Sequence, residues 1–452
     1  MSDLRLDRRY VLGLAAAVAA AGGAALLPSP VAAEGTATDD VKSWLDRHAV
    51  PLPRLDSGGS VDDLRALRGI VCDATIVGLG EPSHGGRELF TARHRALRFL
   101  VERMGFRTIA FEETFGNGRV MDRYIAGGPG DARAIAAEAG APWCSESMAA
   151  LLVWLRDYNR RLPKGERVRF LGTDLVQVRQ LNFDELTAHV ADVSPGSLPE
   201  LETHLAQVGL RGTPGEHIGW LLSRTPEERA ALYTQAKAVH DIVMALPDGP
   251  STMDNEVARQ HARVIQGFYE FYSRNDRAMR DLFMADTIDR WAGLTGEKTV
   301  YWGASVHTAS SPEVTYTIPP RPTVTVAGAG AHLRRRHGRD YLNIGVVFGH
   351  GELYVGWETG SPHPYAIPDP REGTTDEILG RATLPNYLID LRARASGPVA
   401  EWLDGPVEMR GVNSAYYPER DAEYVMTMDR LSAGFEAVMY IRRTSAYVPI
   451  TL

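Results

Sequence analysis

Residues 74–85 read ATIVGLGEPSHG, and this stretch is the strongest indication of how the chain folds. Its first half has the composition of a buried strand. Its second half begins at Gly80 and carries Glu81 and His84, three residues apart. Side chains at the carboxyl ends of strands in α/β sheets face ligand crevices. The stretch therefore predicts a strand that ends at a reactive site.

The segments on either side of this stretch predict a parallel sheet. A strand at 72–80 is followed by a helix at about 87–104 and a second strand at 107–111. Strands joined through a helix by such short links form a right-handed crossover and lie parallel. The alternation continues with a helix at 145–161 and with expected strands at 167–172, 298–303, 322–326, 341–348 and 437–442. We therefore expect an α/β fold with a mostly parallel sheet flanked by helices.

A long helical insertion interrupts this alternation at about 180–292. Most of it, residues 197–290, is charged and contains few glycines or prolines, which favours long helices. An all-helical segment between two strands most simply forms a cap over the strand ends. We therefore expect one catalytic domain over 34–452 that includes this cap.

Polar side chains also follow three other expected strands. The second strand runs into Glu112, the strand at 298–303 leads into His307, and the strand at 167–172 leads to Asp174. The carboxyl ends of parallel strands meet at one edge of a sheet. We therefore expect these residues near Glu81 and His84, with Asp174 either orienting a ligand or capping the next helix.

A carboxylate beside an imidazole is suited to general-base chemistry. The carboxylate fixes the ring tautomer and raises its basicity, so that the ring accepts a proton from water near neutral pH. Neighbouring carboxylates such as Glu81 and Glu112 repel, which raises the pKa of one of them. The same two acids, with His84 and His307, also have the atoms that bind zinc or manganese. No single element supplies two ligands at helical spacing, so a metal-dependent hydrolase is the alternative.

Composition and missing motifs exclude several other classes. The net charge is −8, with 44% hydrophobic residues, so we expect no nucleic-acid partner, because such partners require a basic face. No G-x-S-x-G elbow follows a strand, and no glycine-rich phosphate loop is present. We expect no cofactor. The two cysteines allow at most one disulfide, and we expect Cys72 to be a small buried side chain.

The first 33 residues have the pattern of an export signal. Arg8 and Arg9 precede a mildly apolar stretch that reaches Leu27, and residues 31–33 read VAA, a small-residue cleavage site. Paired arginines ahead of such a stretch indicate the twin-arginine route. We expect an exported protein with no stable membrane insertion after the signal is removed.

Several motifs occur in order over about residues 40–450. They are Gly80–Gly85, Arg93, Phe111–Glu112, Trp154–Asn159, Phe170–Asp174, Arg280–Asp281 with Met284–Ala285, Val300–His307, and Gly328–Arg334 followed by Tyr341, Gly345 and Phe348–Gly349. No single motif is decisive, but the ordered set resembles the erythromycin esterase family.

This resemblance implies a hydrolase of macrocyclic or other esters that needs no metal. On the matching positions, His84 is the general base, and Glu81 and Glu112 orient it and the attacking water. Arg93 and His307 bind or polarise the substrate carbonyl, and the implied partner is a small hydrophobic molecule.

The chain departs from the family after the late strand. Macrolide-opening members usually carry His-Asn-x-His there, whereas this chain carries Ala304-Ser-Val-His307. The substitution favours an ester other than erythromycin. It also leaves open a non-hydrolytic acid–base reaction, such as cyclisation, dehydration or epimerisation, or a protein that binds a compound without turnover.

Overall fold

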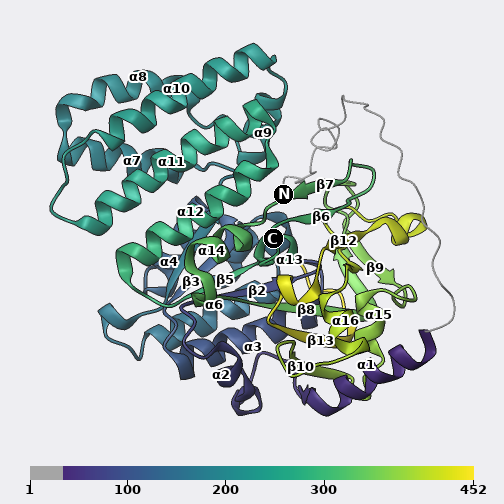
Figure 1. Ribbon diagram of the computed structural model, residues 1–452. Helices are drawn as coiled ribbons and strands as arrows, with labels where there is room; N and C mark the ends of the chain where they lie inside the picture. Colours follow the sequence, from purple (N-terminus) through teal and green to yellow (C-terminus); the bar gives the residue numbers. More distant parts are fainter. Residues whose placement is uncertain (1–33, 452) are drawn as a thin grey trace.

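A nine-stranded sheet forms the centre of the molecule in the computed structural model, which describes residues 34–451 (Figure 1). The strand order is β1-β10-β13-β8-β2-β5-β3-β4, and β9 pairs with β8. The strands from β13 to β4 are parallel, whereas β1, β10 and β9 pair antiparallel. Their bounds are β1 Val50–Pro51, β2 Ile76–Glu81, β3 Thr108–Thr114, β4 Arg169–Asp174, β5 Thr299–Ala304, β8 Tyr341–Val355, β9 His363–Ile367, β10 Asn386–Asp390 and β13 Ala437–Thr444.

The central strands are buried on both faces of the sheet. Successive side chains point to opposite faces, and each face is covered by helices. Val77 and Leu79 pack into the hydrophobic cluster that contains the crossover helix α3 (Arg87–Met104). Ile76, which precedes Val77, packs on the opposite face against the helical insertion. The expected α/β fold with a mostly parallel sheet is confirmed.

Residues 180–295 are mainly helical, as expected. The helices are α7 Gln180–Val193, α8 Leu198–Val208, α9 Pro214–Leu222, α10 Pro226–Met244, α11 Thr252–Arg274 and α12 Arg277–Thr295. Capping boxes at Thr213 and Thr225, each followed by proline, fix where α9 and α10 begin. Asn275 adopts a left-handed conformation (φ 52°) that ends α11 and turns the chain into α12. The helices form a separate bundle beside the sheet in Figure 1.

The remaining helices complete the layers around the sheet. α4 crosses β4, and α14 packs on both α12 and β8. Their bounds are α1 Glu34–His48, α2 Ala66–Val71, α4 Phe115–Ile125, α5 Ala132–Ala137, α6 Glu146–Asn159, α13 Ser305–Thr308, α14 Ala329–His337, α15 Thr375–Gly380, α16 Pro398–Asp404 and α17 Leu431–Gly434. Over residues 34–451, no helix is both long and apolar enough to cross a bilayer. The expected export signal lies outside the described residues.

One expected strand belongs to a different sheet. Residues 324–326 form β7 in a four-stranded antiparallel sheet of order β11-β12-β6-β7, so placing 322–326 in the main sheet was wrong. Their alternation of valine and threonine fits a sheet with one exposed face, whereas central parallel strands are apolar throughout. The partner strands are β6 Val314–Tyr316, β11 Val407–Arg410 and β12 Val425–Met428.

The two cysteines are free. The expectation that Cys72 is buried was wrong, because it follows the last turn of α2 with φ 48° and is exposed. Cys144 is partly buried.

A close approach between α4 and β4 gives a test of the packing. A Cβ added at Gly118 would lie 2.3 Å from the backbone nitrogen of Gly172, which cannot move aside. We expect Gly118→Ala to lower the free energy of unfolding by about 2 kcal/mol, measured by urea denaturation. Gly293, exposed in α12 with open space around its Cα, is the matched control. Gly293→Ala should raise stability by about 0.5–1 kcal/mol; equal effects at both sites would contradict the packing.

Candidate active site

The first element of the site is a chain of three buried groups at the end of β2. His84 Nδ1 lies 2.8 Å from Glu81 Oε1. The other oxygen of Glu81 forms an ion pair with the guanidinium of Arg93 on α3, and neither side chain is exposed. Arg93 also lies over the ring of Trp302, with its Cζ 4.2 Å from the ring centroid. Glu81 is therefore fixed from behind by Arg93 and presents one oxygen to the imidazole.

This arrangement determines the tautomer of a neutral His84. A carboxylate oxygen only accepts, so Nδ1 must carry the proton and Nε2 is left as the acceptor. Nε2 has no hydrogen-bond partner among the described residues, and it is not sealed from solvent. The ring lies against Trp143, with centroids 4.5 Å apart, and lines a cavity of about 330 Å³.

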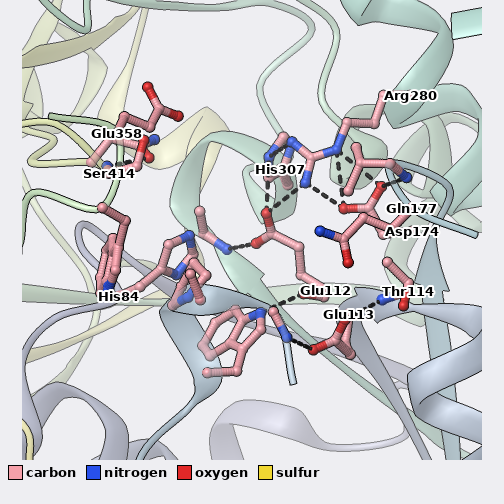
Figure 2. Close-up of a pocket in the computed structure, with 18 residues that line it drawn as sticks. His84, Glu112, Glu113, Thr114, Asp174, Gln177, Arg280, His307, Glu358 and Ser414 are labelled. Atoms are coloured by element: carbon pink, nitrogen blue, oxygen red, sulfur yellow. Dashed lines mark hydrogen bonds and ion pairs between the residues drawn. The ribbon is translucent and has the colours of Figure 1, made fainter. Parts of the chain in front are cut away.

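Glu112, at the end of β3, is the centre of a second cluster on this cavity (Figure 2). Its Oε2 accepts a hydrogen bond of 2.7 Å from the backbone nitrogen of Ala304. Its Oε1 lies 3.0 Å from Arg280 Nη2 and 3.3 Å from His307 Nε2. Burial alone would raise the pKa of Glu112, but the nearby charges of His307 and Arg280 hold it well below the usual range. Glu112 is therefore a carboxylate.

His307 is held as an imidazolium by two carboxylates. Its Nδ1 lies 2.7 Å from Asp281 Oδ1, and Glu112 lies at its other nitrogen. Burial lowers the pKa of His307, but Asp281 and Glu112 outweigh both burial and Arg280 and raise it to about 10. Arg280 Nη1 is 3.2 Å from His307 Nε2. Because both groups are donors when the ring is charged, we interpret this contact as two cations sharing Glu112.

Arg280 connects the helical insertion to the strand ends. Its Nε lies 3.1 Å from both oxygens of Asp174, at the end of β4, and its Nη2 reaches Glu112. The carboxylates of Asp174 and Glu112 outweigh burial and raise the pKa of Arg280 well above its ordinary value. The guanidinium is therefore a fixed positive charge at the cavity wall, as Figure 2 shows.

The structure brings most of the expected site residues together. His84, Glu112, Asp174 and His307 line the same cavity. Glu81 and Arg93 lie behind it, fully buried. The placement of Arg93 differs from the substrate contact that the resemblance implied, because its guanidinium is enclosed between Glu81 and Trp302. Its geometry is that of a residue that positions Glu81.

Three residues of the site were assigned no role in the sequence analysis. Arg280 and Asp281 belong to one of the motifs that carry the family resemblance, but they lie on α12, away from any strand end, so the strand-end rule did not include them. Glu113 is also buried and lines the cavity. It accepts hydrogen bonds from Thr114, Asn117 and Gly140, and burial raises its pKa. A register irregularity between β3 and β4 over residues 111–114 accompanies this placement.

The four residues considered as metal ligands do not converge on one point. The oxygens of Glu81 are directed at His84 and Arg93, and those of Glu112 at Ala304, Arg280 and His307. Within residues 34–451, no group of three or more histidine, cysteine, aspartate or glutamate side chains is arranged to hold a metal ion.

The fold and the site together define an α/β protein with a carboxylate–imidazole pair and a clustered set of cations at the ends of its parallel strands. The chain belongs to the erythromycin esterase family, whose model matches residues 101–444. This membership supports a hydrolase. The matched range includes Glu112, Asp174, Arg280 and His307 but begins after Glu81 and His84. The inclusion of Glu81 and His84 in the site therefore depends on their geometry alone.

Curated relatives and solved structures agree with this assignment. Erythromycin esterase type II of Escherichia coli is 34% identical over 134 residues, which are 30% of this chain and 31% of that protein. The match thus spans about a third of that relative. The Bacillus subtilis protein named "Putative hydrolase YbfO" is 21% identical over 388 residues, covering 80% of this chain and 84% of its own.

Three solved structures share the fold. A Bacillus cereus protein has a TM-score of 0.80 at 24% identity, covering 92% of this chain and 99% of its own. A succinoglycan biosynthesis protein has a TM-score of 0.78 at 22% identity, covering 92% and 100%. A mutant of the erythromycin esterase EreC in its open conformation has a TM-score of 0.63 at 16% identity, covering 87% and 97%.

The buried ion pair behind His84 gives a stability prediction. Arg93→Met leaves Glu81 as an uncompensated buried charge, which should lower the free energy of unfolding by about 3–5 kcal/mol. The double variant Arg93→Met/Glu81→Gln removes that charge and should recover part of the loss. Urea denaturation of wild type, both single variants and the double variant measures the coupling. A loss below about 1 kcal/mol for Arg93→Met would contradict the pairing.

The charge on His307 predicts how stability depends on pH. Its pKa is raised from 6.5 in the unfolded chain to about 10 in the fold. The resulting stabilisation is fully present below pH 6.5 and is lost as the pH rises through about 10. We expect the free energy of unfolding of the wild type to fall by a few kcal/mol over this range. His307→Gln should show a clearly smaller fall; equal slopes would contradict a charged His307.

Proposed function

We propose that this protein hydrolyses a carboxylic ester or lactone, with His84 activating the attacking water. The observation that carries the proposal is the free Nε2 of His84 at the cavity wall, combined with the Glu81 contact that leaves it unprotonated. An imidazole of this kind is the usual general base near neutral pH. Family membership supports the hydrolase class.

The two cations opposite His84 supply the electrophilic half of the reaction. Arg280 and His307 line the same cavity, and both are kept charged by buried carboxylates. Fixed positive charges in a partly enclosed site stabilise the oxyanion that forms when a carbonyl is attacked. Glu112 holds the two cations together. The negative charge of Glu112 offsets the repulsion between Arg280 and His307.

The proposed reaction consists of attack by water, collapse of the intermediate and protonation of the leaving group. Nε2 of His84 takes a proton from water while the water oxygen bonds to the carbonyl carbon, and the carbonyl oxygen becomes an oxyanion facing Arg280 and His307. Collapse of this intermediate breaks the ester C–O bond. The imidazolium of His84 then protonates the departing alkoxide, which gives an acid and an alcohol and returns His84 to its starting form.

The family, and one position at which this chain departs from it, support a proposed substrate class. Relatives named as erythromycin esterases favour a hydrophobic, macrolide-like ester or another secondary metabolite. Ala304 stands where macrolide-opening members usually carry histidine, and its backbone nitrogen is bound to Glu112. We therefore favour an ester other than erythromycin, hydrolysed outside the cytoplasm as the signal sequence at 1–33 predicts.

Removing the imidazole tests the proposal. His84→Ala should lower kcat/KM by at least about a hundredfold on any ester that the wild type hydrolyses, because general-base catalysis contributes on that scale. His350→Ala is the matched control, since that ring is partly exposed and pairs with Asp369 outside the cavity. Near-normal turnover by His84→Ala would contradict the proposed role.

Labelled water and a chelator separate the alternative reactions. In H₂¹⁸O, hydrolysis places one labelled oxygen in the carboxylic acid, measured by mass spectrometry. A product without label would favour cyclisation, dehydration or epimerisation by the same acid–base groups.

Loss of activity with EDTA that is restored by added zinc or manganese would favour a metal-dependent hydrolase.

A further inference from the structure

A second cavity adjoins the catalytic one on the side of the helical insertion. Its volume is about 470 Å³, and it shares Val176, Arg280, His307 and Glu358 with the first cavity. The ends of α9 and α11 and the starts of α10 and α12 surround it, and β6 faces them. Arg280 and His307 thus stand between the two cavities, and a substrate whose carbonyl lies on these cations has room to extend into the second one.

Part of the wall of the second cavity is apolar. Phe271 and Tyr272 line it from α11, Leu222 from the end of α9 and Tyr316 from β6. Tyr272 is held by a hydrogen bond of 3.1 Å from its hydroxyl to the carbonyl oxygen of Val176. Aromatic and aliphatic walls of this kind bind the hydrocarbon part of a small molecule.

The charges of the second cavity are unbalanced. Its two carboxylates among residues 34–451 are Glu358 and Asp281, and Asp281 is paired with His307. Of the four arginines among these residues that line it, two are neutralised: Arg280 by Asp174 and Glu112, and Arg321 by Glu358. The other two, Arg229 at the start of α10 and Arg277 at the start of α12, form no ion pair with any residue in 34–451. Nε of Arg229 is buried and has no hydrogen-bond partner among these residues.

The catalytic cavity has the opposite character. Glu112, Glu113, Asp174 and Glu358 line it. Its cations among residues 34–451 are Arg280 and His307, which it shares with the second cavity. An extended ligand that spans both cavities therefore meets a carboxylate-rich wall at one end and two unpaired guanidinium groups at the other. A buried polar group without a partner costs free energy, so Nε of Arg229 favours a ligand that supplies an acceptor, and the unpaired charge of Arg277 beside it favours an anion.

We infer that the second cavity binds a carboxylate on the substrate, so that the substrate is an amphipathic ester with a free acid group distant from the scissile bond. The placement of the ester at His84 rests on the proposed function. The carboxylate matches the planar, forked donors of arginine, which bind two oxygens at once. The hydrocarbon between the ester and the acid lies against Phe271, Tyr272 and Tyr316.

Binding of a ligand that cannot be hydrolysed tests this inference independently of catalysis. Isothermal titration calorimetry with 4-phenylbutyrate measures recognition of an amphipathic carboxylate, and 4-phenylbutanamide is its neutral counterpart. We expect the acid to bind at least about tenfold more tightly than the amide. Arg229→Gln and Arg277→Gln should each remove most of this difference. Arg339→Gln, which removes an equal charge from an exposed side chain outside both cavities, should retain it.

Three results would overturn the inference. They are equal affinity for the acid and the amide, an equal loss in Arg339→Gln, and affinity for inorganic phosphate as high as for 4-phenylbutyrate. The last result would indicate a site for a free inorganic anion instead of an amphipathic acid. Circular dichroism of each variant establishes that the fold is intact before affinities are compared.

Kinetics then link the second cavity to the reaction. The mono-p-nitrophenyl ester of adipic acid carries a distal carboxylate, and p-nitrophenyl hexanoate is its neutral analogue of equal chain length. We expect the ratio of kcat/KM for the acidic over the neutral ester to fall at least about tenfold in Arg229→Gln and Arg277→Gln but not in Arg339→Gln. A ratio unchanged in the first two variants would overturn the inference.

These experiments can contradict either proposal without contradicting the other. If His84→Ala leaves turnover intact while 4-phenylbutyrate binding still depends on Arg229 and Arg277, the assigned base is wrong and the anion site stands. If His84→Ala abolishes turnover while acid and amide bind equally, the base stands and the anion site is wrong.

Discussion

The site depends on burying two carboxylates at strand ends together with the cations that pair with them. Glu81 ends β2 and meets Arg93, and Glu112 lies near the end of β3 and meets Arg280 and His307. An unpaired charge at either position would cost several kcal/mol. The cations come from the crossover helix, from the insertion and from the short helix α13 after β5, and Arg280 is 168 residues from Glu112. The site therefore forms only when all of these elements are in place.

The two carboxylates have different consequences for the residues beside them. Glu81 is closed on one side by Arg93 and uses its other oxygen to orient His84, whose Nε2 remains available. Glu112 gathers two cations and a backbone N–H, which fixes positive charge across the cavity. Base and electrophile are thus held apart by the rigid spacing of strands β2, β5 and β3. In the proposed reaction, the ester carbonyl lies between them.

The sequence was informative where one short stretch decided the local structure. The boundaries of α3 and the parallel direction of the strands that it joins followed from residues 72–111, and the strand-end rule located Glu81, His84, Glu112, Asp174 and His307. The order of the strands was not predicted, and β5 lies between β2 and β3. Arg280 and Asp281 were missed because they reach the site from a helix, and that contact depends on how the insertion folds back. Arg93 was located correctly, but its orientation toward Glu81 instead of the cavity is a matter of packing. The second sheet was missed because it forms only when β12 pairs with β6, and Thr427 and Thr315, which this pairing joins, are 112 residues apart. No local pattern encodes that pairing, although β6 with β7 and β11 with β12 pair locally.

The central claim is that Glu81 fixes His84 with its proton on Nδ1 and leaves Nε2 free to accept one. Long-range ¹H–¹⁵N NMR correlation spectra of ¹⁵N-histidine-labelled protein, at a pH where the ring is neutral, report which ring nitrogen is protonated. The account predicts a protonated Nδ1 and an unprotonated Nε2 for His84, with the tautomeric preference lost in Glu81→Gln. A ring protonated on Nε2 in the wild type would contradict it.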